Sequence, residues 1–140
     1  MRGGLWLIPL ALALSACSRS SVSVTPSPVP VGPDPKVVSR VISRAAEQIK
    51  ICYRSPRLNR TARQIVTVLR VRYTIEGNLA TKPVLIRQSG VTEDNMIFAG
   101  QMTRAAMAAV ERCAPLRLPS ELYKGGWDEF DLTFSPRGLA

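Results

Sequence analysis

The rest of the chain is organised around the stretch ERCAPLRLPSELYKGGWDEFDLTFSP, residues 111–136. It begins at the end of a segment whose apolar residues recur at helical spacing, and we expect that helix to end at Cys113. Two prolines then bound an irregular connection, because proline has no backbone N–H to donate. Beyond the paired glycines, apolar and polar residues alternate as in a half-buried strand whose apolar face carries Phe130, Leu132 and Phe134. The stretch therefore predicts a helix, a connection and a strand, and it contains no obvious catalytic chemistry.

Outward from this stretch, the sequence predicts two amphipathic helices. Asp34-Pro35 marks the start of the first helix, with Asp34 as the N-cap, and Cys52 lies at its end. In the second helix, Thr92 or Asp94 can act as the cap. Its apolar stripe consists of Phe98, Met102, Ala105, Ala106, Ala109, Val110 and Cys113. The small residues in this stripe would let the helix lie close to a sheet.

Two strands are expected between the helices. The stronger pattern spans Gln64 to Ile75, with one apolar face and a second face that becomes basic halfway along. After a glycine turn the chain returns in Leu79 to Gln88, with Val84 and Ile86 facing inward. Pro83 marks a bulge or a sheet edge in this second strand, because it cannot donate to a central ladder.

The third strand is expected over Trp127 to Phe134. Together these elements predict an α+β fold in the order α-β-β-α-β. This is a small three-stranded antiparallel sheet with the two main helices packed on one face. We assign the folded domain to residues 37–137, one domain in a chain of 140 residues.

Residues 1–16 have the shape of a secretory signal, with Arg2 as the only charge. The apolar run is shorter than the about 20 residues that a stable bilayer span needs. The sequence LSAC at 14–17 fits the cleavage box of bacterial lipoproteins, in which the Cys17 thiol carries the lipid. An ordinary signal peptide with a chance cysteine is the alternative. Residues 17–36, rich in Pro and Ser, form an extended linker that would reach about 50 Å.

The chain is basic. Its formal net charge is +9, and removal of residues 1–16 takes away Arg2 and no acid, which leaves +8. This charge predicts acidic partners such as anionic lipid headgroups, lipopolysaccharide phosphates or an acidic protein face. A merely soluble basic surface is the alternative.

Four arginines lie three residues apart in the segment after the first helix, namely Arg54, Arg57, Arg60 and Arg63. They form either a basic rim for acidic lipid or glycan or a solvated loop. No aromatic residue interleaves with them, which argues against stacking on a single-stranded nucleic acid. An exported protein also rarely meets nucleic acid, so we expect no nucleic-acid partner.

Two cysteines remain besides Cys17, namely Cys52 and Cys113. An exported protein matures in an oxidising compartment, where such a pair usually forms a disulfide. The bond would close a loop of about 60 residues and would stabilise the fold by about 4 kcal/mol in the chain-entropy model. Two free buried thiols are the alternative. Because the chain has no histidine, we expect no metal site.

The sequence lacks the motifs of common enzymes. Without histidine there is neither a histidine general base nor a standard serine triad. There is also no glycine-rich phosphate loop and no HExxH motif. The acidic residues Asp128, Glu129 and Asp131 are interpreted as a solvated strand edge. We therefore expect a protein that is not an enzyme, with no catalytic residues and no cofactor.

Several motifs together resemble a known family. CYRSP ends the first helix, YTIEGNLATKP holds the hairpin turn, and AVERCAPLRLPSELYKGGWDEFDLTFSPR covers the last helix and strand. With these motifs, the stretch of residues 38–137 resembles the C-terminal domain of TolA, within the TolA/TonB C-terminal group. The most specific part of the resemblance is the RCAPLRLP…W…LTFSP run.

The resemblance implies a small antiparallel sheet with helices on one face and a role in binding partners in the periplasm. The family's usual partner is TolB, and recognition proceeds by strand addition at an exposed sheet edge. The edge-forming stretches implied here are Val84 to Gln88 and Phe130 to Phe134. The partner-binding residues expected are Val84, Ile86, Gln88, Phe130, Leu132 and Phe134. Cys52 and Cys113 match the disulfide positions of the family.

One departure from the family concerns the anchor. TolA and TonB resemble each other in an N-terminal transmembrane helix coupled to an ion-driven motor, whereas this chain has a lipobox. We expect a lipid-anchored protein of the cell envelope that faces the periplasm. The outer membrane is favoured, because Ser18 is not an Asp retention signal. The expected function is a TolA-type binding module that acts in envelope integrity through protein contact. The alternative is a basic structural tether that binds anionic lipid, lipopolysaccharide or peptidoglycan.

Overall fold

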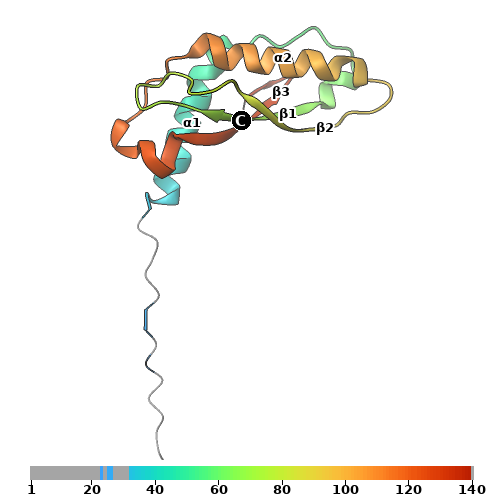
Figure 1. Cartoon of the computed structure of the whole chain (residues 1–140). Coiled ribbons are helices and arrows are strands. Elements are labelled where there is room, and N and C mark those ends of the chain that lie inside the picture. The colour runs from blue at the N-terminus through green and yellow to red at the C-terminus, as the bar shows by residue number, and fades with distance from the viewer. Residues whose placement is uncertain (1–22, 24, 27–31, 140) are drawn as a thin grey trace, which may run out of the picture. The chain divides into compact units, whose positions relative to one another are not determined.

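The computed structural model describes residues 23, 25–26 and 32–139 (Figure 1). The folded unit falls within Val31–Ala140. The expected signal peptide 1–16 and the lipidated Cys17 lie outside the described residues, as does most of the expected linker. No helix in the described part of the chain is both long and apolar enough to cross a membrane.

The described residues form two long helices, three short helical turns and four strands. The helices are α1 Pro35–Cys52 and α2 Met96–Cys113, and the short turns are η1 Thr61–Gln64, η2 Ser120–Leu122 and η3 Tyr123–Trp127. The strands are β1 Val66–Arg72, β2 Val84–Ser89, β3 Glu129–Ser135 and β4 Gly138–Leu139. Figure 1 shows α2 running alongside the strands, whereas α1 runs across them.

The four strands form one sheet in the order β2-β1-β3-β4, and every neighbouring pair is antiparallel. The fold is α+β, but the expected three-stranded sheet and the α-β-β-α-β order are wrong. The additional strand, β4, forms because the chain reverses after Ser135. The Ser135 hydroxyl accepts a hydrogen bond from Arg137 N at 3.2 Å and donates one to Gly138 O at 3.1 Å. A strand of two residues is too short to show alternation in a sequence.

The position of β3 also differs from the prediction. We expected Phe130 to Phe134 at an open edge, but β3 lies between β1 and β4 in the sheet. β3 pairs with β1 from Thr67 to Arg72, and its end pairs Phe134 with Leu139 of β4. The long pairing with β1 places β3 over the centre of the core, so its apolar face serves packing.

The first helix begins as the sequence predicts. Asp34 Oδ1 accepts a hydrogen bond from Lys36 N at 2.8 Å, and Pro35 occupies the first turn, where its missing N–H is not needed. The buried face of α1 consists of Val41, Ala45, Ala46 and Ile49. α1 ends at Cys52, as expected.

The main core lies between one face of the sheet and both helices. The register pairs Leu69 with Leu132 and Val71 with Phe130, so these side chains share the covered face. Trp127 is fully buried beside them, and its Nε1 donates a hydrogen bond to Pro119 O at 2.7 Å. The proline-rich connection therefore supplies the acceptor that the buried indole needs.

A disulfide joins Cys52 at the end of α1 to Cys113 at the end of α2. Their Cα atoms are 5.7 Å apart, within the usual range for a bridged pair. The predicted pairing is confirmed, and the alternative of two free thiols is wrong. Close to the bridge, Arg112 Nη2 donates a hydrogen bond to Cys52 O at 2.9 Å. The two helix ends are therefore held together covalently and by a charged hydrogen bond.

Candidate functional site

The open edge of the sheet is β2. Within the described residues, β2 pairs with β1 on one side and has no strand on the other. An unpaired edge offers a row of backbone N–H and C=O groups to an incoming strand. Three successive apolar side chains are exposed along it: Val84 by 55%, Leu85 by 40% and Ile86 by 42%. We call Val84–Ser89 the β2 edge.

The expectation that Val84 and Ile86 face inward is wrong. Val84 pairs with Arg70, whose side chain lies on the uncovered face of the sheet. Val68 of β1 pairs with Arg87, but the next residue, Leu69, pairs with Leu85. The register between β1 and β2 therefore shifts after Val68. Ile86 is therefore the extra residue of a bulge, a feature common at sheet edges. The result places these apolar side chains where a partner can contact them.

Gln88 has a different role from the one expected. Its Nε2 lies 2.9 Å from Thr67 Oγ1, 2.8 Å from Ala99 O and 3.0 Å from Thr103 Oγ1. The side chain therefore faces the covered side of the sheet and ties β2 to β1 and α2. Gln88 therefore holds the β2 edge in place, whereas the side chains of Val84 and Ile86 are exposed.

A buried asparagine fixes the loop that follows β2. Asn95 is fully buried, and its Oδ1 accepts a hydrogen bond from Thr92 N at 2.7 Å. Its Nδ2 donates to Thr61 O at 3.0 Å and to Gly90 O at 2.8 Å. Gly90 has φ +72°, and a Cβ built there would lie 2.0 Å from Gln64 O, so glycine is required. These contacts hold the end of β2 against η1.

Asn95 is a structural residue that the sequence reasoning missed. We expected Thr92 or Asp94 to cap α2, but neither side chain forms a hydrogen bond to the helix start in the structure. Asn95 occupies the N-cap position without a side-chain bond to the helix, because its amide is committed to the neighbouring loops. A single polar residue in a loop gives no sequence signal of burial, so this role is visible only in three dimensions.

The remaining predicted partner-binding residues lie inside the protein. Phe130, Leu132 and Phe134 of β3 are buried in the main core with both helices. The Phe134 ring packs at 5.3 Å from that of Tyr53, and the Phe130 ring packs at 5.8 Å from that of Tyr73. Their side chains are therefore not accessible to a partner in this fold.

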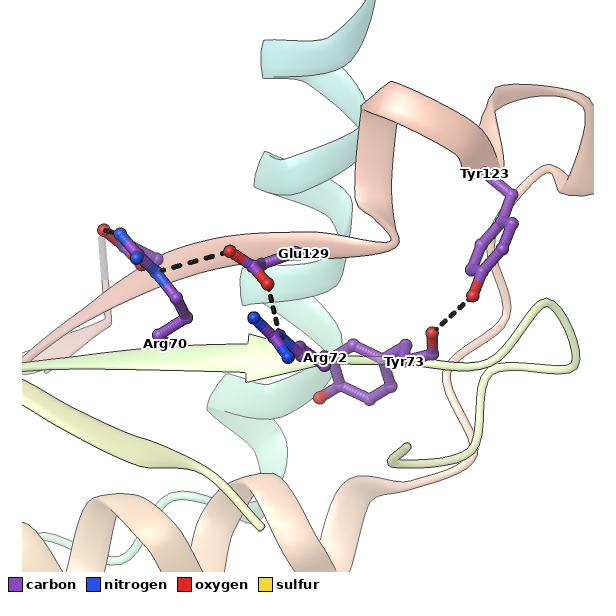
Figure 2. Close-up of polar contacts among 6 residues, drawn as sticks. Arg70, Arg72, Tyr73, Tyr123 and Glu129 are labelled. Atoms are coloured by element: carbon purple, nitrogen blue, oxygen red, sulfur yellow. Dashed lines mark hydrogen bonds and ion pairs between the residues drawn. The ribbon is translucent and has the colours of Figure 1, made fainter. Parts of the chain in front are cut away.

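The uncovered face of the sheet carries three cross-strand ion pairs, which join Arg70 to Asp131 and to Glu129 and Arg72 to Glu129 (Figure 2). Arg70 Nε lies 2.8 Å from Asp131 Oδ1 and Arg70 Nη2 lies 3.1 Å from Asp131 Oδ2, a two-point contact. Arg72 pairs with Glu129. The Asp131 carboxylate raises the pKa of Arg70. Because solvent screens exposed pairs of this kind, they contribute little to stability.

Tyr73 follows β1, and its ring is buried beneath the same region (Figure 2). Its backbone carbonyl accepts a hydrogen bond from the Tyr123 hydroxyl at 2.8 Å. Burial raises the pKa of Tyr73, so its hydroxyl stays protonated at neutral pH. No described residue accepts a hydrogen bond from that hydroxyl.

The described residues contain no group of three or more carboxylate or cysteine side chains placed to hold a metal ion. No family model matches the chain, and neither a curated protein nor a solved structure matches it.

Proposed function

We propose that the protein is a periplasm-facing lipoprotein binding module of TolA C-terminal type, which contributes to envelope integrity through protein contact. The observation that carries the proposal is the β2 edge, which among the described residues pairs with β1 on one side only and has three successive exposed apolar side chains. The sequence resemblance supports a TolB-type periplasmic protein as the partner.

The mechanism is strand addition. A partner strand would form main-chain hydrogen bonds with the free side of β2, which supplies affinity without requiring a particular partner sequence. Specificity would come from side chains, because Val84 and Ile86 offer apolar contact beside that free side. The bulge at Ile86 divides the edge, so a partner strand must fit an irregular register.

The anchor completes the proposal. A lipid on Cys17 would hold the protein at the outer membrane, and the proline-rich linker would let the domain reach about 50 Å from the bilayer. This arrangement differs from a motor-coupled transmembrane anchor. The module would hold or compete for its partner near the membrane instead of pulling on it.

Substitution at the exposed apolar side chains tests the proposal. Ile86→Lys places a charge beside the free side of β2, and we expect it to weaken binding of a purified TolB-type protein about tenfold, measured by calorimetry. The matched control is Ile51→Lys, because Ile51 is 86% exposed on α1, away from the sheet edge. Binding of the control should stay within about twofold of wild type.

Two results would contradict the proposal. One is equal loss of binding in both variants, which would show that an added positive charge weakens binding wherever it lies on the surface. The other is full binding by Ile86→Lys. Thermal unfolding of both variants should match wild type within a few degrees, because both side chains are exposed.

A further inference from the structure

A second surface feature lies away from the β2 edge. A pocket of about 450 Å³ opens between the loop after α1 and the turn that joins β3 to β4. Three arginines line it, namely Arg57 and Arg63 from the α1–β1 segment and Arg137 from the β3–β4 turn. The other residues that line it are Ser55, Pro56, Leu58 and Pro136. Arginines that are far apart in the sequence therefore line one cavity.

These arginines have no acidic partner. The ion pairs among the described residues join Arg70 and Arg72 to Glu129 and Asp131 on the uncovered sheet face. No carboxylate lines the pocket. The stretch from Gln48 to Ile75 contains seven basic residues and no acid: Lys50, Arg54, Arg57, Arg60, Arg63, Arg70 and Arg72. Like charges gathered at one cavity repel, and a bound anion removes that cost.

The backbone beneath Arg57 and Arg63 is held by specific hydrogen bonds. Asn59 Oδ1 accepts from Thr61 Oγ1 and from Ala62 N, both at 2.9 Å, and this fixes the start of η1. Asn95 Nδ2 holds Thr61 O from the other side. Leu58 packs on a small second core formed by Ala62, Ile65 and Met102. Arg57 and Arg63 therefore extend from a segment with a defined position.

The third arginine is fixed by the β3–β4 turn. Ser135 Oγ accepts a hydrogen bond from Arg137 N and donates to Gly138 O. The turn therefore presents Arg137 toward the arginines of the α1–β1 segment. A site whose backbone is already ordered spends less free energy on ordering when a ligand binds.

We propose that this pocket binds a phosphate group. Arginine donates two parallel hydrogen bonds to phosphate oxygens, and its planar fork fits them better than lysine does. The unesterified oxygens of a phosphate group, three on a terminal phosphate and two on a phosphodiester, point in different directions, which suits donors that come from the α1–β1 segment and from the β3–β4 turn. The cavity exceeds the size of inorganic phosphate, so it has room for the next part of a phosphorylated molecule.

The phosphate has two chemical sources, a soluble phosphorylated compound or the headgroup of an anionic phospholipid. Neither source requires strand addition at the β2 edge, so this site stands independently of the proposed protein contact. The experiment uses pyrophosphate as the soluble probe. Vesicles of phosphatidylglycerol, compared with vesicles of phosphatidylcholine, serve as the lipid probe.

The test uses the full chain with Cys17→Ser, so that no lipid on this residue contributes to vesicle binding. We expect Arg63→Gln and Arg137→Gln each to weaken binding of the better probe about tenfold. The matched control is Arg44→Gln, which removes the same charge from the exposed face of α1 and leaves the pocket intact. The control should bind within about twofold of the parent chain.

Each outcome of the binding experiment supports or overturns the proposed phosphate site. Binding of pyrophosphate without preference for phosphatidylglycerol supports the site and identifies a soluble ligand. Preference for phosphatidylglycerol with weak pyrophosphate binding supports the site and identifies a headgroup. Equal weakening by Arg44→Gln would overturn the proposal, because net charge alone would then explain binding. Absence of binding to both probes would overturn it as well. Unchanged circular dichroism in the variants excludes misfolding as the cause of a loss.

Discussion

Two tyrosines near the end of β1 differ in how their hydroxyl groups are satisfied. Tyr123 donates its hydroxyl hydrogen to Tyr73 O at 2.8 Å. The Tyr73 hydroxyl is buried and has no hydrogen-bond partner among the described residues. A buried polar group without a partner costs free energy, whereas the same ring without the hydroxyl packs equally well.

Tyr73→Phe should therefore leave the free energy of unfolding unchanged or raise it by up to about 1 kcal/mol. Tyr123→Phe is the matched control, and it should lower the free energy of unfolding by about 1 kcal/mol because the Tyr73 carbonyl loses its donor. Urea denaturation of both variants measures the difference. Marked destabilisation by Tyr73→Phe would show that the hydroxyl has a partner after all.

The same residue predicts a dependence on pH. Burial raises the pKa of Tyr73 above its ordinary value of 10.0. In the unfolded chain the phenol ionises near that value, while in the folded chain it stays protonated. Tyr73 therefore does not lower the free energy of unfolding below about pH 10, and that free energy falls as the pH rises above this value. Tyr73→Phe should make this alkaline loss of stability shallower.

At the residue scale, the sequence predicted contacts that depend on neighbours in the chain and missed those that depend on the fold. The Asp34 cap follows from adjacent residues and was predicted correctly. The roles of Gln88 and Asn95 depend on Thr67, Ala99 and Thr61, which lie elsewhere in the sequence. The sequence alone does not distinguish a polar residue that faces water from one that donates to a buried acceptor.

At the scale of elements, the disulfide joins the ends of α1 and α2. The bridged residues are 61 positions apart, so the bond restricts a long loop of the unfolded chain. Replacing both residues, Cys52→Ala with Cys113→Ala, should lower the free energy of unfolding by about 4 kcal/mol. Denaturant unfolding with and without reductant measures this loss.

The control for the disulfide prediction is the effect of reductant on the wild-type protein and on the double variant. Reductant should destabilise the wild-type protein and leave the double variant unchanged. A reductant effect of equal size in both proteins, or none in either, would contradict a stabilising role for the bond. The comparison separates the bond itself from packing of the two side chains.

The bounds of the helices and strands also show which features sequence patterns predict and which they do not. Both helix ends at cysteine follow from capping and periodicity, and they were correct. The second strand was expected to begin at Leu79, but β2 begins at Val84, because residues 74–83 form turns and a single bridge from Tyr73 to Leu79. The sequence predicted that the apolar residues of β2 face inward, because alternation indicates an amphipathic strand but does not indicate a bulge or an edge.

In the whole molecule, the proposed function requires an anchor, a linker and a domain with a free sheet edge. Removal of the proposed lipid site, Cys17→Ser, should move the protein from the membrane fraction to the soluble fraction of the cell envelope. Fractionation followed by immunoblotting measures this change. Unchanged membrane association of Cys17→Ser would contradict the lipid anchor and leave the β2 edge proposal intact.

The most direct test of the central claim measures amide hydrogen exchange with and without a purified TolB-type protein. Strand addition predicts slower exchange in Val84–Ser89, because free N–H groups there become hydrogen-bonded to the partner. Exchange in β3 should stay the same, since β3 lies inside the sheet. Binding that protects other segments while Val84–Ser89 exchanges at its original rate would contradict the account.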